Sequence, residues 1–149
     1  MNLFSFNEIT VNYSSKHMGP AIQSSKDAYD LMLPNWTDIE YTESFYIILL
    51  NRSNKVLGVC KISIGGLAGT VTDPKKIFQT ALKANAASVI LCHNHPSGNT
   101  KPSKSDIEIT KKCVEAGNFL DLKVLDHVIV TRDGYFSFAD EGMLNDLKL

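Results

Sequence analysis

The 149-residue sequence lacks the features that mark several large classes of protein. Its three cysteines, Cys60, Cys92 and Cys113, form an odd, widely spaced set without a CxxC pair, which argues against a disulfide framework and for a reducing compartment. No apolar run approaches the roughly 20 residues of a membrane span, and the N-terminus lacks the basic start and apolar core of a secretory signal. A net charge of −1 gives no overall basic field to attract nucleic acid. We therefore expect a cytoplasmic protein without a membrane segment.

The composition is that of an ordinary globular domain, with 44% hydrophobic and 21% charged residues. Apolar and β-branched runs predict strands over 43–51, 56–64, 88–92, 122–130 and 135–138. Cap residues and apolar stripes predict helices that start after Ser24, at Asp73-Pro74 and near Ser105, with Gly117 ending the last of them. This order of elements predicts an α/β fold with a mixed sheet covered by helices.

Two segments carry weaker patterns. Residues 9–13 alternate faintly between polar and apolar, and we expect a short strand or arm there. Residues 65–70 read GGLAGT and lack the Gly-Lys-Ser/Thr ending of a phosphate-binding loop, so they predict a turn or the lip of a substrate groove.

The chemically distinctive stretch is 89–106, which reads VILCHNHPSGNTKPSKSD. His93 and His95 follow an apolar strand and point the same way, because side chains two apart in extended chain share a face. Asp106, brought back by the intervening turn, can supply a third ligand. Two imidazoles and one carboxylate form a ligand set of hydrolytic zinc sites, which keep a fourth position open for water. Cys92 should face away from both histidines.

Ser103 has two possible roles. Ser-x-x-acid marks a helix capping box, so Ser103 and Asp106 can be explained as a helix start. However, Ser105 and Glu108 match that box better, with the preferred glutamate at its far end. In that case Ser103 lies in the loop before the helix and is free to face the metal.

A zinc hydrolase also needs a carboxylate that takes a proton from water. Glu43 stands out as an acid that opens an otherwise apolar strand. Local sequence alone favours the simpler interpretation, that Glu43 only marks the exposed end of that strand.

Together, Glu43, His93-Asn94-His95-Pro96 and Ser103-Lys104-Ser105-Asp106 resemble the JAMM (MPN/JAB) metalloprotease signature. More narrowly the chain resembles the RadC family, on HNHPSG, PSKSD, Gly69-Thr70 and Leu125-Asp126-His127. The resemblance runs from about residue 24 to residue 144. It implies a three-layer α/β/α domain related to cytidine deaminases.

The resemblance also implies a role for each site residue. His93, His95 and Asp106 would hold Zn²⁺, with water as the fourth ligand. Glu43 would act as general base and later protonate the leaving amine, and Ser103 would donate a hydrogen bond to the oxyanion. The reaction implied is hydrolysis of a peptide or isopeptide bond in a protein substrate.

The domain organisation expected from the resemblance is an N-terminal arm over 1–23 and a RadC-like JAB/MPN domain over 24–149. Longer RadC-like proteins carry a helix-hairpin-helix-like segment ahead of the metal domain, and the residues before position 24 are too few for it. That segment is the part most suited to DNA, and the near-neutral charge likewise speaks against a role on DNA. The alternative functions are DNA processing or repair, which the family name suggests, and a non-catalytic, metal-stabilised interaction module.

Two further sequence features bear on function. A deaminase would need His-x-Glu followed by Pro-Cys-x-x-Cys, and the chain has neither motif, so we reject that chemistry. Asp126 and His127 should lie on opposite faces of their strand and not form a dyad. We expect His127 to be a core histidine or to support a metal ligand.

Overall fold

The computed structural model describes residues 17–65 and 72–147. Its elements are α1 (Ser25–Met32), a 3-10 turn η1 (Leu33–Asn35), β1 (Ser44–Leu50), β2 (Val56–Ile64), α2 (Pro74–Lys83), β3 (Ser88–Asn94), α3 (Lys104–Phe119), β4 (Lys123–Val130), β5 (Tyr135–Ser137) and α4 (Met143–Asp146). The arm expected at 9–13 and most of the glycine-rich segment expected at 65–70 lie outside the described residues.

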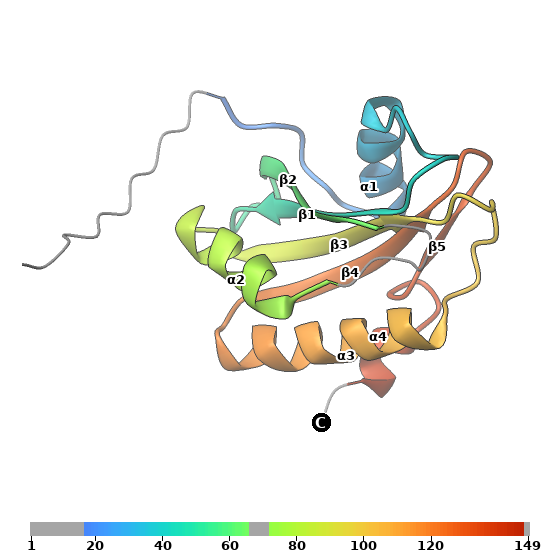
Figure 1. The fold of residues 1–149 in the computed structure, drawn as a ribbon. Helices are drawn as coiled ribbons and strands as arrows, with labels where there is room; N and C mark the ends of the chain where they lie inside the picture. The colour runs from blue at the N-terminus through green and yellow to red at the C-terminus, as the bar shows by residue number, and fades with distance from the viewer. Residues whose placement is uncertain (1–16, 66–71, 148–149) are drawn as a thin grey trace, which may run out of the picture.

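The described strands form one mixed sheet in the order β2-β1-β3-β4-β5. β1 pairs antiparallel with both β2 and β3, β3 pairs parallel with β4, and β5 returns antiparallel to β4. Helix α1 lies on one side of the sheet, and α3 and α4 lie on the other (Figure 1). The predicted mixed α/β fold with helices on both faces is confirmed.

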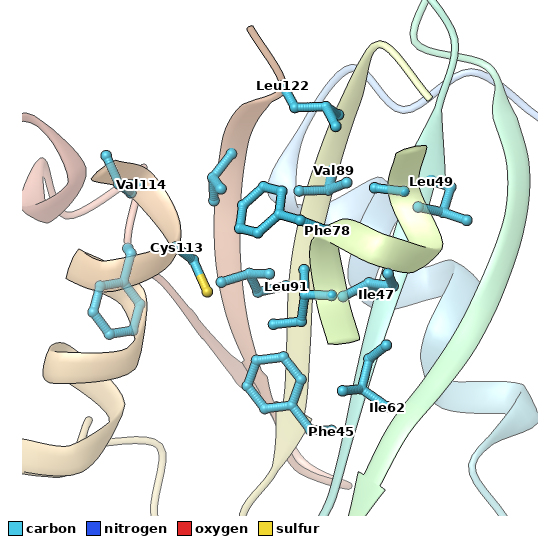
Figure 2. Packing of buried hydrophobic residues seen from close by; sticks show 14 of the residues in the cluster. Phe45, Ile47, Leu49, Ile62, Phe78, Val89, Leu91, Cys113, Val114 and Leu122 are labelled. Atoms are coloured by element: carbon cyan, nitrogen blue, oxygen red, sulfur yellow. The ribbon is translucent and has the colours of Figure 1, made fainter. Parts of the chain in front are cut away.

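Both faces of the sheet are buried, which explains the unbroken apolar runs of its central strands. Alternate residues of β1 enter different cores: Ile47 and Leu49 pack with α2 and α3, whereas Ile48 and Leu50 pack with α1. The first of these cores contains Phe78 of α2 and Cys113 of α3 around the central strands (Figure 2). The parity of each strand residue therefore decides which face, and which helix, its side chain meets.

Two helices begin where the sequence predicts. Ser24 caps α1 through the amide of Asp27, and Asp73 caps α2 through the amide of Lys75 at 2.9 Å, with Pro74 in the first turn. Within the ranges 17–65 and 72–147, no helix has both the length and the apolar character that crossing a bilayer requires.

Two predicted boundaries are wrong. β3 continues past Cys92 to Asn94, so His93 lies inside the strand and not in the loop. α3 runs to Phe119, so Gly117 lies within the helix and does not end it. A Cβ at Gly117 would lie 2.4 Å from the carbonyl oxygen of Leu122, so glycine is needed here for close approach of the chain.

Candidate metal centre

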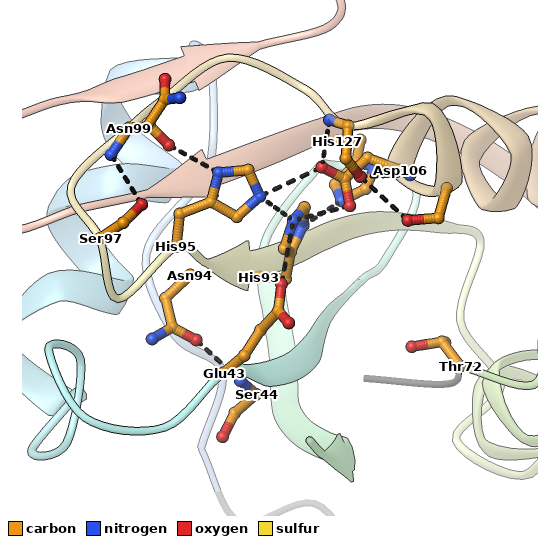
Figure 3. A network of polar contacts seen from close by, with 12 residues as sticks. Glu43, Ser44, Thr72, His93, Asn94, His95, Ser97, Asn99, Asp106 and His127 are labelled. Carbon is orange, nitrogen blue, oxygen red and sulfur yellow. Dashed lines mark hydrogen bonds and ion pairs between the residues drawn. The ribbon is translucent and has the colours of Figure 1, made fainter. Parts of the chain in front are cut away.

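Three separated segments meet at one end of the sheet. His93 lies near the end of β3 and His95 directly follows that strand, while Glu43 immediately precedes β1, whose Phe45 pairs with His93. Asp106 lies in the first turn of α3. The sheet register and the return of the chain into α3 therefore bring all four side chains together (Figure 3).

The atoms that could bind a metal lie close to one another. The Nε2 atoms of His93 and His95 are 2.9 Å apart, and each lies 3.1 Å from an oxygen of Asp106. Glu43 Oε1 lies 4.0 Å from His93 Nε2. Glu43, His93 and His95 each offer a ligand atom within 4.8 Å of the others, so this group could hold a metal ion.

The donor set fits a divalent metal. The backbone carbonyl of Asn99 accepts a hydrogen bond from His95 Nδ1 at 2.6 Å, which leaves a lone pair on Nε2 of the neutral ring. That lone pair faces the His93 ring and the Asp106 carboxylate. These electron-rich atoms repel one another unless a cation or a proton lies among them. Ligands at Zn–N distances of 2.0–2.1 Å in a tetrahedron are separated by about 3.3 Å, close to the spacing observed here.

The electrostatics of the pocket favour positive charge. Burial alone would raise the pKa of Asp106, but the adjacent rings of His93 and His95 hold that pKa well below its usual range. Burial opposes charge on His95 as well, yet Asp106 and the Asn99 carbonyl raise the pKa of His95 above its ordinary value. The carboxylate is thus ionised and attracts either protons or a metal.

Ser103 occupies a different position from the one predicted. It is the N-cap of α3, where its hydroxyl accepts from the amide of Asp106 at 3.1 Å. Asp106 closes the capping box, accepting from the Ser103 amide at 2.8 Å. The expectation that Ser105 caps the helix is wrong, because the helix starts at Lys104. Asp106 therefore serves the helix start and faces the histidines at once.

A cleft of about 220 Å³ opens beside the group. Its lining comes from the start of β1, the end of β3, the residue Thr72 ahead of α2 and the first turns of α3, and includes Glu43, His93, Asp106, Glu108 and Lys112. The side chain of Glu43 is 24% exposed, compared with 3% for His93. Glu43 is therefore more exposed to the cleft than His93, and it lies beside the histidines.

Asn94 is a residue to which the sequence analysis gave no role. Its side chain is fully buried and points away from the histidines, since it has the opposite parity in β3. Its Nδ2 donates to the carbonyls of Ile39 and Thr42, and its Oδ1 accepts from the amide of Ser44 at 2.7 Å. Asn94 therefore anchors the segment that carries Glu43. In the sequence, the feature that indicates this role is a polar residue at a buried position of a strand.

His127 and Cys92 lie where they were predicted to lie. His127 is fully buried, with ring nitrogens 2.7 Å from His93 Nδ1 and 2.5 Å from the Thr110 hydroxyl. Burial lowers the pKa of His127 well below its ordinary value. Cys92 packs in the α1 core on the other face, where burial raises the pKa of its thiol.

Asp126 does not form a dyad with the His127 ring. The Asp126 carboxylate accepts from the backbone amide of His127, the hydroxyl of Ser137 and the amide of Ala139. It therefore ties β4 to the end of β5 and to the turn that follows.

Comparison with known proteins gives a consistent result. A sequence model of the family described as "RadC-like JAB domain" matches residues 22–143. A protein named "UPF0758 protein" from Flavobacterium johnsoniae is 48% identical over 122 residues, covering 82% of this chain and 53% of the relative. Namesakes from Rubrobacter xylanophilus and Methanosarcina mazei are 42% and 41% identical over 84% and 83% of this chain, and over 54% and 53% of their own lengths. The chain spans about half the length of these relatives.

Proposed function

The chain belongs to the RadC-like JAB domain family, and from that membership we propose that it is a zinc-dependent hydrolase of the JAMM type that cleaves an amide bond. The observation that carries this proposal is the convergence of two imidazole nitrogens and a carboxylate at 2.9–3.1 Å, with Glu43 beside them. The match of donor types to hydrolytic zinc sites supports zinc as the metal.

In this proposal His93, His95 and Asp106 hold the metal. A bound zinc ion would supply Lewis acidity and lower the pKa of water to about 7. Glu43 accepts a proton from the attacking water, whose oxygen forms a bond to the carbonyl carbon. As the C–N bond breaks, Glu43 returns that proton to the leaving amine. Its position between the cleft and the histidines supports this role.

Ser103 is proposed to stabilise the negative charge that develops on the carbonyl oxygen. Its oxygen accepts from the amide of Asp106, so its single proton remains available for donation. In the structure its oxygen lies 3.0 Å from the hydroxyl of Ser105, which can itself donate the proton of that contact. Such a donor typically contributes a factor of about 10²–10³ to the rate.

We propose a peptide or isopeptide bond in a protein as the substrate, because the zinc chemistry is the same for both. We also propose a reducing, cytoplasmic setting, which the free thiols of Cys60, Cys92 and Cys113 support. The net charge of −1 does not favour the alternative of DNA processing.

The test is hydrolysis of peptide and isopeptide libraries by the zinc-loaded protein, read by mass spectrometry of the products. Glu43→Gln should retain zinc and lose about 10²–10⁴-fold in rate, because it removes the general base. Glu141→Gln, which alters an exposed glutamate of the chain after β5, is the matched control and should cleave as wild type does. Equal rates for Glu43→Gln and wild type, or a zinc-loaded wild type that cleaves nothing, would refute the proposal.

A further inference from the structure

Both histidines of the centre must present a lone pair on Nε2 to bind a metal, and a neutral imidazole does so only when its proton is on Nδ1. His95 obtains this state from the Asn99 carbonyl in its own loop. That loop turns back at Gly98, whose φ of 82° is readily adopted by glycine. His93 lies inside β3, and its Nδ1 meets another imidazole, that of His127. Whereas a backbone carbonyl fixes the tautomer of His95, the tautomer of His93 therefore depends on the protonation of His127.

The protonation of His127 is set by a hydrogen bond within α3. The carbonyl oxygen of Asp106 can only accept a hydrogen bond, and the Thr110 hydroxyl lies 2.6 Å from it. Thr110 must give its single proton to that carbonyl, because the reverse would leave two unprotonated oxygens in contact. The Thr110 oxygen is then available only as an acceptor for His127 Nδ1, which lies at 2.5 Å.

The proton on His127 is therefore on Nδ1. The His127 ring is fully buried, and its nitrogens contact a hydroxyl and an imidazole, so a second proton would bury a charge with no carboxylate at either nitrogen. The Nε2 of His127 is accordingly bare, and at 2.7 Å it must accept the proton of His93 Nδ1. This leaves His93 Nε2 with a lone pair facing His95 and Asp106.

Aromatic packing holds the two rings in this orientation. Phe138 stacks on His127 with 4.9 Å between ring centroids, and Phe45 stacks on His93 at 5.8 Å, with interplanar angles of 9° and 5°. The rings are thereby held with their nitrogens aligned.

We propose that Thr110 and His127 are positioning residues that fix His93 in the tautomer able to bind metal. The chain of hydrogen bonds starts on the carbonyl of one ligand residue, Asp106, and ends on the ring of another, His93. It thus couples α3 to β3 through β4. The proposal rests on the metal site of the proposed function but does not depend on hydrolysis.

The direct test is NMR of ¹⁵N-histidine-labelled, metal-free protein, in which long-range ¹H–¹⁵N correlations identify each tautomer. His93 and His127 should both carry their proton on Nδ1. A His93 ring protonated on Nε2 instead would overturn the proposal. Because this readout needs neither metal nor substrate, it separates failure of the hydrogen-bond chain from failure of the proposed hydrolase.

Variants extend the test. Thr110→Val removes the acceptor at almost constant volume, and should shift part of His93 to the Nε2–H tautomer and weaken Zn²⁺ binding about 10–100-fold. Thr110→Ser should restore both properties. Thr80→Val is the matched control, because the Thr80 hydroxyl makes the same bond to the carbonyl four residues earlier, in α2. If Thr110→Val does not fold, the histidine tautomers measured in the wild type and in Thr110→Ser still test the proposal. Unchanged tautomers and Zn²⁺ affinity in a folded Thr110→Val would refute the proposal.

Discussion

Replacing Asn94 by alanine should cost about 1.5–4.5 kcal/mol of folding stability, because three hydrogen bonds are lost together and each contributes ~0.5–1.5 kcal/mol. Two are donated to the carbonyls of Ile39 and Thr42 at 2.7 and 2.8 Å, and one is accepted from the amide of Ser44 at 2.7 Å. Ser44 is fully buried, so its amide would remain unsatisfied. Asn94→Asp should lose still more folding stability near neutral pH, because it places a carboxylate against the carbonyl oxygens of Ile39 and Thr42.

Urea unfolding of wild type, Asn94→Ala and the control Asn118→Ala measures this cost. Asn118 is an exposed residue near the end of α3, and its variant should stay within about 0.5 kcal/mol of wild type. In the folded Asn94→Ala protein, zinc binding should persist while hydrolysis falls, because the segment carrying Glu43 is no longer anchored. A stability loss below about 0.5 kcal/mol would contradict the assigned role of Asn94.

Two further predictions concern stability. Gly117→Ala should lower the free energy of unfolding by about 1–3 kcal/mol in urea titrations, since its Cβ would lie 2.4 Å from the Leu122 carbonyl; an unchanged midpoint would contradict the close approach. Burial raises the pKa of Asp126 above 3.8 despite hydrogen bonds from Ser137 and from backbone amides. The folded state therefore binds the Asp126 proton more tightly than the unfolded state. The stability that this proton contributes is fully present below the pKa of Asp126 in the unfolded chain, and it is lost as pH rises through the pKa of Asp126 in the folded protein. The stability of Asp126→Asn relative to wild type should accordingly rise from about pH 4 upward, and a pH-independent difference would argue against a raised pKa.

The sequence predicts those features that depend on short-range periodicity and capping. β2 was expected over the residues it occupies, and α2 begins at Asp73-Pro74 as its cap requires. The shared face of His93 and His95 follows from a two-residue spacing at the end of a strand, and it brings their Nε2 atoms together. The catalytic roles and the identity of the metal stay predictions.

What the sequence could not predict depends on contacts between distant segments. Two serines fit the capping pattern of α3, and the choice of Ser103 is favoured because Asp106 can then both cap the helix and face the histidines. Gly117 resembles a helix stop, but its requirement for glycine comes from the returning chain at Leu122. The contact of Asn94 with Ser44 depends on the pairing of β1 with β3, and the contact of Thr110 with His127 depends on the packing of α3 against β4.

The most direct test of the account is elemental analysis of the purified protein and of His95→Ala, with His17→Ala as control, because His17 is exposed and lies far from the centre in sequence. Wild type and the control should contain about one zinc ion per chain, and His95→Ala close to none, because losing one of three protein ligands opens the site. A folded, unchelated wild type without stoichiometric metal, or a His95→Ala protein that retains it, would contradict the central claim.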